Sequence, residues 1–321
     1  MRVVLLIFLC LLAYSGTSVH AQGPGFIYGQ DTLTIDLDPA FPGPETPFTA
    51  TANDYSLPVQ GTGIRWFVNG TLVTDARNER KLELESTPVG GKTEIRLVID
   101  LADGSSVSAT RTVEPMYLDI IVEPQTRTPA FYKGRPLPSI GSTVNATALI
   151  NGTPSKAGEY IYTWQINGET LESGAVRGKN VVSFTMPRGE RAVLSLEVRT
   201  PRGDTLARRT VGLSNATPAL KFYEISTLYG LSTRALSDST PLTGATLAVR
   251  AEPYHLDLAT YNDPDVAEWR INNQVTGNQS NNPYEITLAA NGIGGRTQIQ
   301  FHVRNTTQVL QGTKGAFLMT F

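Results

Sequence analysis

The stretch "IRWFVNGTLV", Ile64 to Val73, decides how this chain is read, because nearly the same phrase occurs three times. It returns as "YTWQINGETL" from Tyr162 and as "AEWRINNQVT" from Ala267. The three tryptophans, Trp66, Trp164 and Trp269, are separated by 98 and 105 residues. A period of this size is that of one sandwich-sized domain, so the phrase marks a threefold internal repeat.

Alternating apolar residues surround each copy of the phrase. One such run follows each tryptophan by about 30 residues, and period-2 alternation of this kind predicts half-buried β-strands. These positions are Ile95, Leu97 and Ile99, then Leu194, Leu196 and Val198, then Ile299, Phe301 and Val303. Similar runs precede each tryptophan, at Phe48, Ala50 and Ala52, at Val144, Ala146 and Ala148, and at Leu247, Val249 and Ala251. Glycine turns such as Asp103-Gly104 then favour a hairpin and a returning strand.

About seven short strands per unit is the pattern of an immunoglobulin-like β-sandwich. We therefore predict an all-β protein of three tandem Ig-like sandwiches, over residues 22–115, 116–213 and 214–321. Trp66, Trp164 and Trp269 are interpreted as core residues. No paired cysteines flank them, so PKD-like and bacterial Ig-like sandwiches are the better comparison.

The first 21 residues have the features of a signal peptide. Arg2 precedes an apolar run from Val3 to Tyr14, and Val19-His20-Ala21 is a small-x-small cleavage site. The sole cysteine, Cys10, lies within this segment. The expectation is a secreted or cell-envelope protein. The alternative, an uncleaved anchor, is the one route to membrane association.

Charge and composition argue against several function classes. With 27 basic and 29 acidic residues, the chain lacks the positive excess of a nucleic-acid binder. Beyond residue 21 it has two histidines, His255 and His302, and no cysteine. Metal sites built from those ligands are excluded, and no nucleophile motif is present. We therefore expect no cofactor and no enzyme, and His302 should face solvent from a strand.

Acidic residues and glycosylation sequons add little. Asp36 and Asp38 alternate on a strand, which is typical of a solvated face. Asp263, Asp265 and Glu268 precede the third tryptophan and are a calcium candidate, but no spaced Asp-x-Asp-x-Asp-Gly loop accompanies them, and a solvated turn is favoured. Six Asn-x-Ser/Thr sequons occur, at Asn69, Asn145, Asn151, Asn215, Asn278 and Asn305.

The units differ most in the connection between their first two strands. The first has the short "AFPGPETPF", whereas the second has "TRTPAFYKGRPLPSIGS" and the third "STLYGLSTRALSDSTPLTG". The two insertions share an aromatic, glycine, arginine, leucine order: Phe131, Tyr132, Arg135 and Leu137, against Leu228, Tyr229, Arg234 and Leu236. Aromatic and arginine side chains anchor protein interfaces. Packing between neighbouring domains is the favoured interpretation, and binding of an external ligand is the other.

Three phrases, "TPAFYKGRPLPS", "LYGLSTRAL" and "RAEPY", together with the tryptophan repeat, resemble uncharacterised secreted Ig-like or PKD-like proteins of ultrasmall candidate-phylum bacteria. The resemblance covers most of residues 22–321. It implies an extracellular or cell-envelope setting and names no activity and no site.

The sequence therefore predicts a non-catalytic extracellular or cell-surface array that acts in adhesion or in binding a protein or glycan. The alternative is a structural component of a cell-envelope or pilus-like assembly, in which an edge such as the last strand "GAFLMTF" pairs with a partner.

Overall fold

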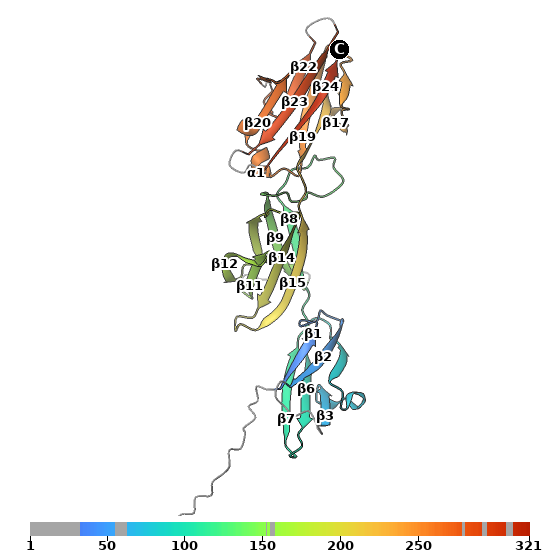
Figure 1. The fold of residues 1–321 in the computed structure, drawn as a ribbon, viewed down its shortest axis with the longest axis vertical. Coiled ribbons are helices and arrows are strands. Elements are labelled where there is room, and N and C mark those ends of the chain that lie inside the picture. The colour runs from blue at the N-terminus through green and yellow to red at the C-terminus, as the bar shows by residue number, and fades with distance from the viewer. Residues whose placement is uncertain are drawn as a thin grey trace, which may run out of the picture.

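The computed structural model describes residues 33–54, 63–151, 153–154, 158–277, 280–290, 294–305 and 311–321. Three β-sandwiches follow one another along the long axis of the molecule (Figure 1). The predicted signal peptide and the sequon residue Asn278 lie outside the described residues.

The first sandwich pairs a three-stranded sheet with a four-stranded one. The first sheet has the order β1 (Leu33–Asp38), β2 (Pro47–Asp54), β5 (Lys81–Glu85). The second has the order β4 (Thr71–Leu72), β3 (Gly63–Val68), β6 (Thr93–Asp100), β7 (Ser106–Val113). A short 3-10 turn, η2 (Thr74–Ala76), leads to β5.

The second sandwich repeats this order. One sheet contains β8 (Leu118–Pro124), β9 (Thr143–Ile150) and β13 (Val181–Thr185), with β10 (Thr153–Pro154) also paired to β9. The other has the order β12 (Glu169–Arg177), β11 (Ile161–Ile166), β14 (Arg191–Arg199), β15 (Thr205–Ser214).

The third sandwich has two additional strands. One sheet has the order β17 (Gly230–Ala235), β16 (Ala219–Ser226), β19 (Thr246–Tyr254), β22 (Glu285–Ala289). The other has the order β18 (Ser239–Pro241), β24 (Gly312–Thr320), β23 (Arg296–Arg304), β20 (Ala267–Ile271), β21 (Gln274–Thr276). The turns α1 (Leu258–Tyr261) and η3 (Pro264–Val266) connect β19 to β20. Both additional strands, β17 and β18, come from the long insertion predicted from the sequence.

The strand order confirms the all-β prediction of tandem immunoglobulin-like sandwiches. In each copy the first, second and fifth main strands form one sheet, and the tryptophan strand, its short hairpin partner and the last two strands form the other. This arrangement is shared by immunoglobulin and fibronectin type III sandwiches. Because β18 pairs in parallel with β24 from Ser239 to Pro241, the last strand is covered along residues 318–320. The exact domain boundaries remain predictions.

The tryptophans fill the space between the two sheets of each sandwich, with exposed fractions of 0, 2 and 2 per cent. Each indole N–H donates to the backbone carbonyl just before the next sheet strand. The acceptors are Glu79, Lys179 and Pro283, at 2.9, 2.9 and 3.0 Å. A buried indole needs such a partner. The repeated tryptophan therefore also fixes the segment that crosses from one sheet to the other.

The asparagine three residues after each tryptophan is also explained by the local structure. Asn69, Asn167 and Asn272 all have a left-handed φ, of 49°, 50° and 47°. Asparagine is among the few non-glycine residues that accept this conformation readily. Each side-chain oxygen accepts from a backbone N–H on the neighbouring strand, at Glu94, Val193 and Gln298. The repeated Trp-x-(Val/Ile)-Asn phrase thus both closes a hairpin and ties it to the adjacent strand.

Candidate functional site

The insertion of the second sandwich, residues 125–142, lies against the third sandwich. Arg127 N–H donates to the Leu256 carbonyl at 2.7 Å, and His255 N–H donates to the Arg127 carbonyl at 2.7 Å. Leu258 N–H donates to the Gln125 carbonyl at 2.9 Å. Together with the bridge between Thr126 and Asp257, these bonds form a short antiparallel ladder across the two sandwiches. We call this ladder, residues 125–127 and 255–258, together with the side chains that pack around it, the joint.

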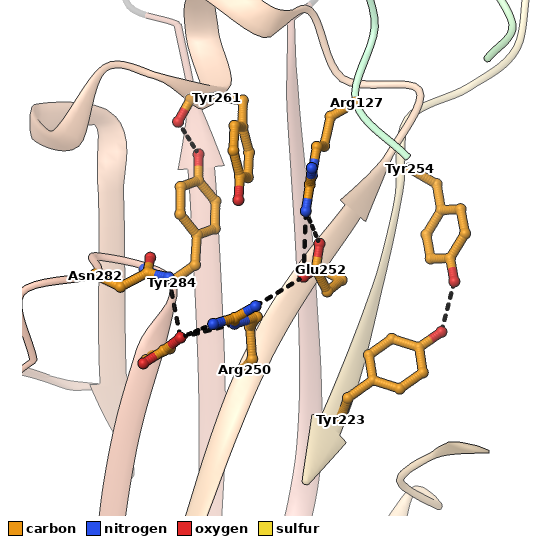
Figure 2. Close-up of polar contacts among 9 residues, drawn as sticks. Arg127, Tyr223, Arg250, Glu252, Tyr254, Tyr261, Asn282 and Tyr284 are labelled. Carbon is orange, nitrogen blue, oxygen red and sulfur yellow. Dashed lines mark hydrogen bonds and ion pairs between the residues drawn. The ribbon is translucent and has the colours of Figure 1, made fainter. Parts of the chain in front are cut away.

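A charged cluster lies beside the ladder, as Figure 2 shows. Glu252 on β19 is 1 per cent exposed, and its carboxylate is 3.1 Å from the Arg127 guanidinium and 3.7 Å from Arg250. Arg250 also donates to Glu285 at 2.8 Å through Nε. The Arg127 guanidinium lies 4.8 Å from the ring centroid of Tyr261, a cation–π contact. Burying a carboxylate between two arginines costs much less free energy than burying it without a partner.

Aromatic rings pack on both sides of this cluster. Tyr261 and Tyr284 stack with centroids 4.4 Å apart, and the Tyr284 hydroxyl donates to the Tyr261 carbonyl at 3.0 Å. On the other side, the hydroxyls of Tyr223 and Tyr254 are hydrogen-bonded at 2.6 Å. Burial raises the pKa of Tyr254, Tyr261 and Tyr284, so all three phenols stay protonated through the physiological range.

A second set of polar contacts attaches the end of the insertion to the third sandwich. The Gln311 side chain is fully buried, and its amide donates to Ser139 Oγ at 3.0 Å and to the Ile140 carbonyl at 2.6 Å. Its oxygen accepts from Asp257 N–H at 3.0 Å. The Asp257 carboxylate in turn accepts from Thr143 N–H at 2.8 Å. Every one of these bonds connects the second sandwich to the third or orients a residue that does.

The joint has a desolvated polar interior of its own. Of the ten buried polar or charged residues in the described part of the chain, seven lie in or beside it: Thr126, Ser139, Ser142, Glu252, Asp257, Thr260 and Gln311. Buried polar groups with satisfied partners specify one arrangement, because any other leaves them unpaired. Arg127 Nε is buried without a hydrogen-bond partner, but the other pairings of the joint favour a single arrangement of the two sandwiches.

The insertion of the third sandwich has a different structure. Its first part extends β16 into a hairpin with β17, and Leu228 and Tyr229 at the tip are 84 and 89 per cent exposed. Both backbone N–H groups donate to Ser226 Oγ, at 3.3 and 3.2 Å, and Gly230 follows with φ +72°. The turn is thus held by local bonds while its two large side chains project into solvent. We call residues 226–230 the tip.

The interaction residues predicted from the sequence therefore divide into two groups, one in each insertion. Those of the second sandwich's insertion contact the third sandwich. Phe131 packs edge-on against Tyr223 at 5.1 Å, and Tyr132 against Tyr254 at 5.4 Å. Leu137 donates its N–H to His255. The side chains of Tyr132 and Leu137 are still 38 and 37 per cent exposed, and Arg135 is exposed too. In the other insertion, Tyr229 is exposed, Arg234 N–H donates to Ser232 Oγ, and Leu236 packs against the core.

Four residues that carry the joint were not singled out from the sequence: Arg127, Glu252, Asp257 and Gln311. Glu252 had a misleading signal, because the alternation that turns Val249 and Ala251 toward the core turns Glu252 outward, as on a solvated face. Gln311 had none, since its role depends on a sandwich more than 170 positions away along the chain.

Two of the three candidate calcium carboxylates, those of Asp263 and Glu268, have other partners in the structure. Asp263 Oδ1 accepts from Asp265 N–H at 3.1 Å and caps η3. Glu268 pairs with Arg270 at 2.6 Å. Among the described residues, no three His, Cys, Asp or Glu side chains gather as metal ligands would. Likewise, none of the helices in the described ranges is long and apolar enough to cross a membrane.

The junction between the first and second sandwiches is of another kind. It contains an open groove lined from both sides, by Phe41 and Arg111 of the first sandwich and by Asp204 and Leu206 of the second. Arg208 lies over the Phe41 ring at 5.5 Å, at the limit of a cation–π contact. The insertion that builds the joint has no equivalent here, because the connection in the first sandwich is short.

No family model and no curated protein matches the chain. Solved structures with similar folds include the three N-terminal domains of the bacteriophage RB49 highly immunogenic outer capsid protein, at 10 per cent identity over 90 per cent of this chain and 98 per cent of that one, with a TM-score of 0.26. The central fibronectin-III array of RIM-binding protein matches at 9 per cent identity over 89 and 94 per cent, with a TM-score of 0.27.

A structure from a 1.5-MDa bacterial ice-binding adhesin matches at 12 per cent identity over 90 and 96 per cent, with a TM-score of 0.24. Scores this low support no argument about function, and the fold assignment rests on the strand pairing described above.

Proposed function

We propose that this chain is a non-catalytic extracellular or cell-surface array of Ig-like sandwiches that acts in adhesion, with the tip of the third sandwich as its contact for a protein or glycan. The observation that carries the proposal is the near-complete exposure of Leu228 and Tyr229 side by side. Single exposed apolar residues are ordinary, but two adjacent large ones on a fixed turn are typical of interaction sites.

The local geometry of the tip favours binding. The Ser226 hydroxyl holds the turn through two backbone N–H groups, so little conformational entropy is lost when a partner covers it. Burial of each of the two side chains contributes about 1.5–3 kcal/mol of apolar transfer free energy. A tyrosine also offers a hydroxyl for a polar partner, which suits either a protein or a glycan.

The joint supports this role by fixing the third sandwich on the second. A binding surface on a hinged domain loses orientational freedom when it binds a partner. On a domain with a fixed connection, that freedom has already been lost on folding.

The test is a glycan and protein array screen with residues 22–321, repeated with the double variant Leu228→Ala/Tyr229→Ala. Tyr117→Ala is the control, because Tyr117 is an exposed tyrosine on another sandwich, at 47 per cent. We expect a ligand whose binding falls at least tenfold in the double variant and is unchanged in the control. Equal binding by all three proteins would disprove the assignment of the tip.

The alternative role in a pilus-like or envelope assembly was based on the last strand as a free edge. That edge is shorter than predicted, since β18 pairs with residues 318–320 of β24.

A further inference from the structure

The aromatic part of the second insertion, residues 129–137, is fastened to the third sandwich separately from the rest of the joint. We call it the arm. Its Tyr132 ring meets the rings of Tyr254 and His255, with centroids 5.4 and 6.1 Å away. At its end, Leu137 N–H donates to Nδ1 of His255 at 3.1 Å. Gly134 keeps the arm compact, because a Cβ at that position would lie 2.7 Å from the Tyr132 ring.

The bond to Leu137 requires a neutral imidazole. Nδ1 accepts a hydrogen bond only through its lone pair, and in the imidazolium ion both ring nitrogens are donors. A protonated His255 would therefore present an N–H to the N–H of Leu137, and the fastening would be lost. The other attachments of the insertion, through Arg127, Asp257 and Gln311, use no imidazole. At the end of the arm, the Leu137 carbonyl also accepts from Thr126 Oγ at 2.9 Å and the Pro138 carbonyl from Ala216 N–H at 2.7 Å, so the part of the arm that is released precedes Leu137.

We propose that the arm is an acid-sensitive latch, released when His255 becomes protonated, while the remainder of the joint stays closed. Release uncovers Phe131 on the arm and Tyr223 and Tyr254 on the third sandwich, and it frees the Tyr132 ring, which is 38 per cent exposed in the closed state. The chain would then present a larger aromatic surface at acid pH than at neutral pH.

The surroundings of His255 favour its neutral form while the arm is closed. The faces around the ring are the phenols of Tyr132 and Tyr254, which are uncharged in this range. On its own element, the nearest carboxylates are engaged elsewhere: Glu252 with Arg127 and Arg250, and Asp257 with the N–H groups of Thr143 and Ala259. The arm itself carries two cations, Lys133 and Arg135, which add no stabilisation for an imidazolium.

The direction of the pH effect follows from these contacts. Burial lowers the pKa of His255 below its ordinary 6.5 in the closed state, whereas release of the arm exposes the His255 ring and makes it easier to protonate. Closure is therefore fully present above 6.5 and is lost as the pH falls from 6.5 through the closed-state pKa. Within that interval the ratio of released to closed arms rises by up to about tenfold per pH unit.

A spin label on the arm tests the proposal. In residues 22–321, which contain no cysteine, Lys133→Cys provides a single labelling position on the exposed side of the arm. We expect the mobile fraction of the label to increase as the pH is lowered from 7.5 to 4.5. His255→Asn keeps an acceptor atom in the place of Nδ1, tolerates the residue's φ of +60°, and cannot be protonated. In that variant the label should stay immobile throughout.

Two further variants separate the latch from a general loss of structure. Leu137→Pro removes the donor N–H and leaves His255 intact, so the label should be mobile at every pH and the pKa of His255, measured by NMR, should rise toward 6.5. His302→Asn removes the other histidine of the described chain and should leave the profile of the arm unchanged. A second label at Val193 on β14, 45 per cent exposed, should not respond to pH.

Several results would overturn the proposal: no change of label mobility with pH, the same pH profile in His255→Asn as in the natural sequence, or an immobile label in Leu137→Pro. Mobilisation at Val193 over the same range would also overturn it, because the sandwich as a whole would then be loosening.

Discussion

At the scale of single residues, the repeated phrase is explained by hydrogen bonds as much as by apolar packing. Asn167 occupies a left-handed turn, and its side-chain oxygen holds Val193 N–H at 2.9 Å. The indole of Trp164 holds the carbonyl of Lys179. Each bond connects the phrase to another segment of the same sandwich. Every sandwich needs these connections, so the phrase occurs three times.

The turn asparagine gives a graded prediction. Asn167→Ala loses the hydrogen bond and must accept a left-handed φ, so we expect the free energy of unfolding to fall by about 2 kcal/mol. Asn167→Gly tolerates the φ and loses mainly the bond, so the decrease should be about half as large. Urea unfolding followed by tryptophan fluorescence provides the comparison. A larger loss for Gly than for Ala would contradict this account of the turn.

The buried carboxylate at the joint gives a second prediction. Glu252→Ala leaves the Arg127 guanidinium without its carboxylate partner, and breaking a buried pair in this way costs about 3–5 kcal/mol. Glu114→Gln removes one partner of the exposed pair with Lys92 and should cost under about 1 kcal/mol. Both can be measured by chemical denaturation. Equal effects of the two substitutions would mean that Glu252 is not desolvated.

At the scale of elements, two insertions with similar sequences have opposite structural roles. The second sandwich uses its insertion to reach the next sandwich, and the third folds its insertion back into β17 and β18 of its own sheets. The difference lies in the residues that surround each insertion. The arm packs against Tyr254 and His255 of the third sandwich, whereas Leu236 packs against the core of its own sandwich.

This difference predicts the effect of alanine substitutions in the third insertion. Leu228→Ala and Tyr229→Ala should change the free energy of unfolding by no more than about 0.5 kcal/mol, because both side chains are solvated. Leu236→Ala removes a side chain that packs on the core and should cost about 1–3 kcal/mol. Thermal melting curves of the three variants give the order. Destabilisation by the tip variants would show that the tip is structural.

At the scale of the whole molecule, the two junctions predict two cooperative units. The second and third sandwiches share a buried polar joint, so they should unfold in one calorimetric transition, with the first sandwich unfolding in another. Gln311→Ala and Arg127→Ala should separate the joined transition into two by weakening its coupling.

The control for this prediction is Arg208→Ala at the first junction, which should leave the number of transitions unchanged. Three separate transitions in the natural sequence would show that the joint does not couple the sandwiches.

The sequence by itself determined the repeated unit: the tryptophan phrase, the alternating strands and the sandwich they form, because these features depend on contacts whose spacing recurs in each copy. It also located the two insertions as the places where the copies differ. Only the tertiary structure decided which insertion packs against the neighbouring sandwich and which folds onto its own. That outcome depends on Arg127, Glu252, Asp257 and Gln311, which come from different sandwiches and meet only when both have folded. Pairings between single, non-repeated residues leave no period in a sequence, and the joint is made entirely of them.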